Sequence, residues 1–387
     1  MNQRAIFKLD RYILSVIFIL SICIPFFSGV IESDDTISSV EKRVLAELPL
    51  PPTSLTELSG YPLRFNAYYS DHFGFREILT KEYFKILNRL GNTTFVDDVT
   101  VGQDGWLFLG SIRPGYERHN DPIGDAINAN LFKEDELREF ATSISETKDW
   151  LNDKGIEYVY VIAPNKHSIY FEKLPKYIKK LNDKSSTDQL VAYLRAHTTV
   201  SVVDLRQALL NEKLKHQVYF RTDTHWNSYG ANVAQFEIMK TIIHLFPGQT
   251  TPFLLDDNQF KRSHRGGGDL AVFAKIEKIT EDNPVPVFDS GCVPENKTPD
   301  AKAMETHTMV CGNQGLKALI FHDSFFEALK PFISRQFYRS TYVWEKINYP
   351  SLVQYVEQEK PDIVVEEVVE RSFPYVPKSI HLGDGID

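Results

Sequence analysis

Residue types that could form a catalytic triad occur in two segments of the sequence. The segment RTDTHWNSYG places Asp223 two positions before His225, and the segment ALIFHDSFF contains Ser324. A serine hydroxyl becomes a useful nucleophile when a base takes its proton, and the usual base is a histidine oriented by a carboxylate. If the fold brings these side chains together, the pattern predicts acyl transfer or ester hydrolysis through an acyl-enzyme.

Each half of this pattern also has an ordinary structural interpretation. An Asp-x-His pair arises often by chance, and a serine at the start of a helix is commonly an N-cap. In a straight strand Asp223 and His225 would lie end to end, so a triad requires the chain to turn between them. The helical pattern that begins near Asn227 leaves room for such a turn.

The elements that must position these residues alternate along the chain. Apolar runs predict strands at 156–163, 200–204, 318–321, 341–344 and 363–369, and helical periodicity is found at 133–154, 227–246, 324–337 and 349–359. This alternation predicts an α/β fold with a mostly parallel sheet covered by helices on both faces. Residues 101–110 are expected to form a hairpin, and residues 247–315 are expected to be irregular.

The carboxyl ends of parallel strands are where sites gather in such folds. Three polar segments are predicted to arrive there, namely 164–166, 223–225 and 322–324. The two halves of the candidate triad are therefore expected at the same edge of the sheet.

The N-terminal part of the 387-residue chain differs from the rest. Residues 12–31 carry no charge, basic residues precede this run and acidic residues follow it. Its length matches a bilayer, and the charges orient a cytoplasmic tail (1–11) and an exported remainder. We expect a single-pass signal anchor (12–31), a stalk (32–60) and a catalytic domain (61–387). A cleaved signal peptide is the alternative, although the apolar run is long for one.

The composition excludes some partners and suggests a covalent constraint. A formal net charge of −9 argues against nucleic-acid binding. Cys292 and Cys311 lie in the exported part, where a disulfide is expected to form, with two free thiols as the alternative. No histidine and cysteine spacing indicates a metal site, and no cofactor is expected.

Several motifs together resemble a known family. The strand–Asp-Ser–helix element is similar to that of SGNH hydrolases, with His322 where their glycine stands. The order of Asp-x-His before Ser resembles the alginate O-acetyltransferase family, of the AlgX and AlgJ type. Six segments between residues 40 and 330 carry this resemblance: KRVLAELPLPPTSL, DHFGFRE, GQDGWLFLG, APNKHSIYFEKLP, TDTHWNSYGA and HDSFF. With about 60 residues after Ser324, the chain is most similar to the AlgJ type, which lacks the carbohydrate-binding module of the AlgX type.

The resemblance implies a fold, a reaction and a location. It implies a three-layer SGNH-hydrolase-like fold, the triad Asp223, His225 and Ser324, and O-acetylation of an exported, alginate-like polysaccharide. It also implies that a membrane-bound O-acyltransferase delivers the acetyl groups, and that the domain lies in the periplasm, anchored to the inner membrane. Two alternatives stay open at this point: an acetylesterase with the same triad, and a non-catalytic scaffold of an export complex.

Four further residues are candidates for substrate or oxyanion contacts, each with a structural alternative. Asn165 ends a strand and is either an oxyanion donor or a turn former. Lys166 either contacts an acidic sugar or is solvated. Arg265, in the Gly-rich segment 265–269, is a candidate substrate contact on a mobile loop. Trp226 either stacks on a sugar or packs in the core.

Overall fold

The computed structural model describes residues 48–74, 99–110, 121–276, 279–289, 291–302 and 304–373, and isolated positions before residue 48. The chain divides into two compact units, Met1–Thr93 and Thr94–Asp387. The expected start of the catalytic domain, residue 61, falls inside a helix of the first unit. No helix among the described residues has the length and apolar character needed to span a membrane. Most of the expected anchor, 12–31, lies outside the described residues.

The first unit contributes two short strands and one helix. They are β1 (Ile37–Ser38), β2 (Arg43–Val44) and α2 (Leu55–Asp71). The Ser54 side chain caps the start of α2 by accepting a hydrogen bond from the backbone N–H of Glu57.

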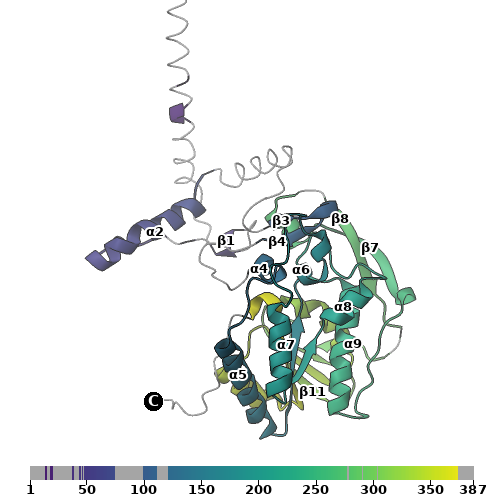
Figure 1. Cartoon of the computed structure of the whole chain (residues 1–387). Helices are drawn as coiled ribbons and strands as arrows, with labels where there is room; N and C mark the ends of the chain where they lie inside the picture. The colour runs from purple at the N-terminus through teal and green to yellow at the C-terminus, as the bar shows by residue number, and fades with distance from the viewer. Residues whose placement is uncertain are drawn as a thin grey trace, which may run out of the picture. The chain divides into compact units, whose positions relative to one another are not determined.

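The second unit is built around a seven-stranded sheet with the order β6-β5-β13-β11-β12-β10-β9. Figure 1 labels β11 of this sheet together with the helices α5, α7, α8 and α9. The first five strands are parallel, and β10 and β9 add antiparallel pairs at one edge, so the sheet is mixed but mostly parallel. Its strands are β5 (Glu157–Ala163), β6 (Ser201–Asp204), β9 (Glu295–Asn296), β10 (His307–Val310), β11 (Lys317–Phe321), β12 (Arg339–Val343) and β13 (Ile363–Val369).

Two antiparallel hairpins stand apart from this sheet. They are formed by β3 (Val99–Val101) with β4 (Leu107–Leu109) and by β7 (Phe260–Gly266) with β8 (Thr280–Pro286). The first confirms the predicted hairpin. The remaining elements are α4 (Pro122–Ala126), α5 (Glu134–Asn152), α6 (Lys166–Ile169), α7 (Ser186–His197), α8 (Arg206–Glu212), α9 (Ser228–Leu245), α10 (Asp269–Phe273), α11 (Lys330–Ile333), α12 (Tyr349–Glu359) and the 3-10 helices η1 (Gln103–Gly105), η2 (Phe171–Lys173), η3 (Asp257–Gln259), η4 (Ser324–Ala328) and η5 (Glu370–Ser372).

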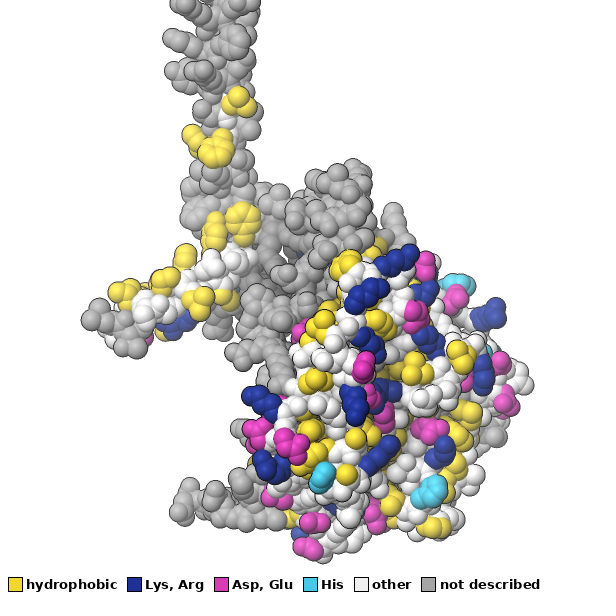
Figure 2. Space-filling view, viewed as in Figure 1, with side chains coloured by type: hydrophobic (Ala, Val, Ile, Leu, Met, Phe, Trp, Pro, Cys, Tyr) yellow, Lys and Arg dark blue, Asp and Glu magenta, His cyan; other side chains and the backbone are white. Residues whose placement is uncertain are grey.

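Alternating side chains of each central strand enter two different cores. In β5, Tyr158, Tyr160 and Ile162 pack with α5, α7 and α12. Val159 and Val161 on the opposite face pack with α8, α9, η4 and α11. This period of two is the geometry of a strand buried on both faces. The result is the predicted three-layer α/β/α arrangement. On the face shown in Figure 2, Lys, Arg, Asp and Glu side chains are interspersed.

Two sequence predictions were wrong in detail. Residues 247–315 are not irregular, since they contain β7–β10 and α10. The β7 strand reads FKRSHRG and is largely exposed, so it lacks the apolar alternation that marks a half-buried strand. The helix expected at 324–337 is instead the short 3-10 helix η4 followed by one turn of α11.

The predicted disulfide is confirmed. Cys292 and Cys311 are bonded, with their Cα atoms 5.6 Å apart. The bridge ties the loop before β9 to the end of β10, at the antiparallel edge of the sheet.

Candidate active site

The candidate site lies at the carboxyl ends of three neighbouring strands. β5, β13 and β11 are adjacent in the sheet, and all run parallel. Asn165 follows β5, Arg371 follows β13 and Ser324 follows β11. As expected for such sheets, polar groups from distant parts of the sequence meet at this edge.

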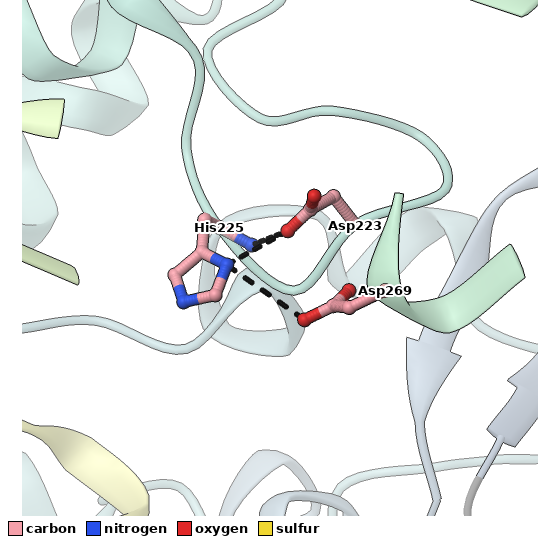
Figure 3. A group of neighbouring side chains, drawn as sticks. All are labelled: Asp223, His225 and Asp269. Carbon is pink, nitrogen blue, oxygen red and sulfur yellow. Dashed lines mark hydrogen bonds and ion pairs between the residues drawn. The ribbon is translucent and has the colours of Figure 1, made fainter. Parts of the chain in front are cut away.

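The structure brings the three predicted triad residues into one hydrogen-bonded chain. The His225 Nε2 atom lies 2.8 Å from the Ser324 Oγ atom, and His225 Nδ1 lies 2.7 Å from Asp223 Oδ1. Figure 3 shows the Nδ1 edge of the ring turned toward Asp223, with Nε2 on the far side. The histidine is thus placed to accept the serine proton while Asp223 holds its tautomer.

A local turn solves the geometric problem of the Asp-x-His spacing. Asp223 Oδ1 also accepts a hydrogen bond from the backbone N–H of His225, at 3.1 Å. This side chain to backbone contact two residues ahead bends the chain, as Asp residues commonly do in turns. The bend brings the ring of His225 back to the same carboxylate.

Arg265 holds the other oxygen of the triad acid. Its Nη2 atom lies 2.8 Å from Asp223 Oδ2, and its guanidinium stacks over the Phe220 ring. Burial by itself would raise the pKa of Asp223. The hydrogen bonds from His225 and the charges of His225 and Arg265 outweigh burial, so this pKa lies well below its ordinary value. Asp223 is therefore ionised at neutral pH, as an orienting acid must be.

The structure corrects the expected location of Arg265. The residue lies on strand β7, paired with Glu281 of β8, instead of on a mobile loop. Its contact with Asp223 makes it a positioning residue for the triad.

A second carboxylate, Asp269, approaches the same histidine. Its Oδ2 atom lies 3.7 Å from His225 Nδ1 (Figure 3). It accepts hydrogen bonds from the hydroxyl and the backbone N–H of Thr224, at 2.5 and 2.8 Å. Burial and the nearby charge of Asp223 raise the pKa of Asp269. Asp269 thus holds Thr224 through both its backbone and its hydroxyl, which fixes the turn that carries His225.

These three side chains could in principle hold a cation, because their ligand atoms lie within 4.8 Å of one another. The contacts argue for a different arrangement. Asp223 already shares its two oxygens between His225 and the guanidinium of Arg265. Since Arg265 supplies the compensating positive charge, the geometry is that of an oriented base.

Lys166 supports the loop that carries Asp223 and His225. It is neither solvated nor free to contact a sugar, so both predicted interpretations of it are wrong. It is buried, and its ammonium group donates to the backbone carbonyls of Phe220, Arg221 and Asp223 at 3.1, 3.2 and 2.7 Å. It also lies over the ring of Phe108. Burial lowers the pKa of Lys166 to about 7, although nearby carboxylates oppose the shift. The side chain is shielded from solvent, and its role is to hold the loop.

The nucleophile loop is fixed by Asp323. Its Oδ1 atom accepts from the backbone N–H of Phe325 and its Oδ2 atom from that of Val369, both at 2.9 Å. These bonds cap η4 and tie it to the end of β13. Ser324 itself is partly exposed, while Phe325 behind it is fully buried. Within the described residues, the backbone N–H of Ser324 has no hydrogen-bond acceptor, so it is available for an oxyanion.

Asn165 offers a second candidate oxyanion donor. Its Oδ1 atom accepts a hydrogen bond from Arg371 Nη1 at 3.1 Å, which fixes the orientation of the amide. The Nδ2 group is buried and has no protein partner in the described part of the chain. A buried amide donor without an acceptor is costly in a native structure, and such costs commonly accompany function. The guanidinium of Arg371 also lies 5.1 Å from the Phe325 ring centroid.

Trp226 and His322 are both buried. Trp226 is buried and packs edge-on against Tyr219 and Phe325, so core packing, one of its two predicted interpretations, is confirmed and the sugar platform is wrong. His322 is buried beside Trp344, and burial lowers its pKa to about 4, so it is neutral.

No specific signal in the sequence pointed to Asp269 or Arg371. Asp269 ends the Gly-rich segment that was flagged only as a site edge, and Arg371 follows a strand without a recognisable motif. Both act through contacts across long stretches of sequence, 45 residues between Thr224 and Asp269 and 206 between Asn165 and Arg371.

Comparison with known proteins identifies the family. Residues 99–309 match the family described as "SGNH hydrolase-like domain, acetyltransferase AlgX". The chain belongs to the AlgX family of SGNH hydrolase-like proteins. The match spans more than half of the chain and includes Asp223, His225, Arg265 and Asp269, while Ser324 lies beyond its end.

Curated relatives agree with this assignment. The chain is 26% identical over 193 residues to the probable alginate O-acetylase AlgJ of Pseudomonas fluorescens, covering 47% of this chain and 43% of that protein. It is 29% identical over 231 residues to the probable alginate O-acetylase AlgJ of Azotobacter vinelandii, covering 57% and 52%. The matched part therefore spans about half the length of these relatives.

A solved structure shares the fold. A DHHW family protein from Eubacterium siraeum superimposes with a TM-score of 0.50 at 16% identity, covering 72% of this chain and 93% of that one. The O-acetyltransferase domain of Pseudomonas putida AlgJ has a TM-score of 0.46 at 21% identity, covering 72% and 92%.

Proposed function

We propose that this chain is an O-acetyltransferase that transfers acetyl groups to hydroxyls of an exported, alginate-like polysaccharide. One observation carries the proposal: His225 bridges Ser324 Oγ and Asp223 Oδ1 at 2.8 and 2.7 Å, in a chain of the AlgX family. That geometry supports covalent catalysis by serine. The polysaccharide is proposed from the printed names of the AlgJ relatives.

The mechanism has two half-reactions. In the first, Ser324 Oγ attacks the carbonyl carbon of an acetyl donor while His225 Nε2 takes the hydroxyl proton. The tetrahedral oxyanion is stabilised by the backbone N–H of Ser324 and by Asn165 Nδ2. The bond to the donor's leaving group breaks, His225 returns the proton to that group, and an acetyl ester on Ser324 remains.

In the second half-reaction a sugar hydroxyl is the nucleophile, and the acetyl group leaves Ser324. His225 Nε2 accepts the proton of the sugar hydroxyl as its oxygen attacks the acetyl carbonyl. The collapse of the intermediate transfers the proton to Ser324 Oγ and releases the acetylated sugar. Asp223 stays ionised throughout and stabilises the imidazolium that forms in each half-reaction.

The location and donor follow as part of the same proposal. The uncharged run 12–31 with basic residues before it and acidic residues after it supports an anchored inner-membrane protein with its catalytic domain in the periplasm. Anchoring keeps the enzyme near a membrane-bound O-acyltransferase that supplies acetyl groups, which raises their effective concentration.

The test separates transfer from hydrolysis. The purified chain is mixed with a chromogenic acetyl ester, with and without a mannuronate oligomer, and the products are analysed by mass spectrometry. The proposal expects acetylated oligomer and a transient gain of one acetyl group on Ser324. Acetate release without acetylated oligomer would identify an acetylesterase instead, and no turnover with unmodified Ser324 would favour a scaffold.

The triad itself has a separate test. Ser324→Ala, His225→Ala and Asp223→Asn should each remove most ester turnover without unfolding the chain. Because the three residues act as a unit, double variants should be hardly slower than the singles. Near-additive losses, or an active Ser324→Ala chain, would reject the triad.

A further inference from the structure

A pocket of about 390 Å³ lies next to the nucleophile helix. It will be called the Lys330 pocket, and its walls include Val293, Met309, Glu327, Lys330 and Arg335. None of these residues takes part in the triad or its supports. The pocket is therefore separate from the groups that carry out the acetyl transfer proposed above.

The geometry of η4 places this pocket beside Ser324. Side chains three positions apart eclipse each other along a 3-10 helix. Ser324 and Glu327 are three apart in η4 and both reach the surface, whereas Phe325 and Phe326 between them are buried. Glu327 is thus one turn from the nucleophile on the same side of the helix, and it forms the near wall of the pocket.

The charged groups of the pocket have a positive balance. Lys330 pairs with Glu327 at 2.5 Å, which neutralises that carboxylate. Arg335 has no carboxylate partner among the described residues. Its one side-chain hydrogen bond there runs from Nη1 to the carbonyl oxygen of Pro331 at 2.9 Å. One cation therefore remains uncompensated in a chain whose formal net charge is −9.

Arg335 is held ready for an anion. Its guanidinium carbon lies 3.8 Å from the ring centroid of Phe288, so the group is stacked in place. A planar guanidinium fixed by stacking loses little freedom when it binds, and its fork of N–H donors fits a carboxylate.

Two apolar walls of the pocket are fixed by the disulfide. Val293 is 81% exposed and faces the pocket together with Met309. Val293 follows Cys292, and Met309 lies two residues before Cys311, so the disulfide holds both walls. Pockets that combine apolar walls with a few placed polar groups are typical ligand sites, and the C–H face of a sugar ring fits such a wall.

We propose that the Lys330 pocket binds a uronate residue of the acceptor polymer, next to the sugar that Ser324 acetylates. The uronate carboxylate pairs with Arg335, the sugar ring lies against Val293 and Met309, and the Glu327–Lys330 pair hydrogen-bonds to ring hydroxyls. Charge complementarity selects an acidic sugar over a neutral one. The inference rests on the proposed function for the identity of the polymer, and adds where it is held.

Binding of defined oligomers to the full-length chain, purified in mild detergent, tests this pocket. A mannuronate tetramer and a neutral mannose tetramer are titrated by calorimetry without any acetyl donor. Arg335→Gln should weaken binding of the mannuronate tetramer by roughly ten-fold or more, since a charge-assisted hydrogen bond is worth about 1.5–3 kcal/mol. Binding of the mannose tetramer and hydrolysis of the small ester should change less than about two-fold, within the range of substitutions away from special features.

A matched pair of variants at Val293 tests the pocket with Arg335 left unchanged. Val293→Glu adds a negative charge to an exposed wall and should also weaken mannuronate binding, while Val293→Ser removes only apolar contact and should weaken it much less. Lys215→Gln, an equal loss of charge at a side chain that is 72% exposed and does not line this pocket, is the control for general electrostatics. Thermal melts verify folding of every variant.

The outcomes separate the pocket from the proposed function. Unchanged mannuronate affinity in Arg335→Gln and Val293→Glu, or an equal loss in Lys215→Gln, would overturn the pocket whatever the catalytic activity. Affinity that falls only in the pocket variants supports it. If the chain binds mannuronate through the pocket but never acetylates it, the proposed function fails and the binding site stands.

Discussion

Replacing Gly268 by alanine should disable the triad by displacing its acid. A Cβ atom added at Gly268 would lie 2.4 Å from Asp223 Cβ and 2.5 Å from Asp223 Oδ2. Ordinary van der Waals contact begins at 3.4 Å, so Asp223 must move by about 1.0 Å to clear its nearest atom, the difference between 3.4 and 2.4 Å. Gly268 has an extended backbone, with φ of −78°, so the effect is steric and owes nothing to backbone strain.

A shift of this size is enough to break the alignment of His225. The Asp223–His225 bond is 2.7 Å long, and lengthening it by that amount takes it beyond hydrogen-bonding range. We expect kcat/KM for a chromogenic acetyl ester to fall by roughly 10² to 10⁴. The lower bound is the usual effect of misplacing a catalytic group by about 1 Å, and the upper bound is the effect of losing the triad acid. Overpacking should lower the free energy of unfolding by about 1–3 kcal/mol.

Gly266 provides the matched control two residues earlier. A Cβ atom there meets nothing within 4 Å, so Gly266→Ala should retain normal turnover and a normal melting temperature. Ester hydrolysis and thermal melts of both variants decide the question. A Gly268→Ala chain as active as Gly266→Ala would refute the packing argument. In an Asp223→Asn chain the added Gly268→Ala change should cost little more activity, because the same contact is already lost.

Three further predictions concern the supports of the site. Lys166→Met removes the donor to three loop carbonyls and should lower the free energy of unfolding by about 3 kcal/mol or more, measured by denaturant titration. The pKa of Lys166 is about 7 in the folded chain and 10.5 ordinarily, so the unfolded chain binds more protons between these pH values and the free energy of unfolding should rise from pH 7 to pH 10.5. Lys166→Met should flatten that rise, and an unchanged dependence of the free energy of unfolding on pH in this variant contradicts the assignment. Cys292→Ser with Cys311→Ser should cost roughly 3 kcal/mol by the chain-entropy estimate, and the unreduced, unfolded native chain should show neither of these thiols on titration. Arg371→Met should free the Asn165 amide and lower kcat about ten-fold or more with little change in KM, approaching the 10²-fold scale of a lost oxyanion donor, and the double variant with Asn165→Ala should be no slower than Asn165→Ala alone.

The sequence by itself determined the local elements and the residue types of the site. The apolar strands at β5 and β13 and the helices α5, α9 and α12 were predicted within a few residues, because each buries a regular face and ends at a recognisable residue. The three triad residue types, the position of Ser324 at the end of a strand and the disulfide partners also came from the sequence. These properties depend on neighbours along the chain or on the chemistry of single side chains. Asp223 and His225 were expected at a strand end, but they lie in the loop between α8 and α9.

Only the tertiary structure decided which side chains support the triad and which face away from it. Lys166 and Trp226 were candidate substrate contacts, yet both are buried, Lys166 under the loop and Trp226 against the core. Arg265 and Asp269 reach the triad from the β7 strand and the start of α10, more than 40 residues from Asp223. Such contacts are set by how separate elements pack, and a hydrogen bond formed across that sequence distance leaves no periodic or local pattern for the sequence to reveal.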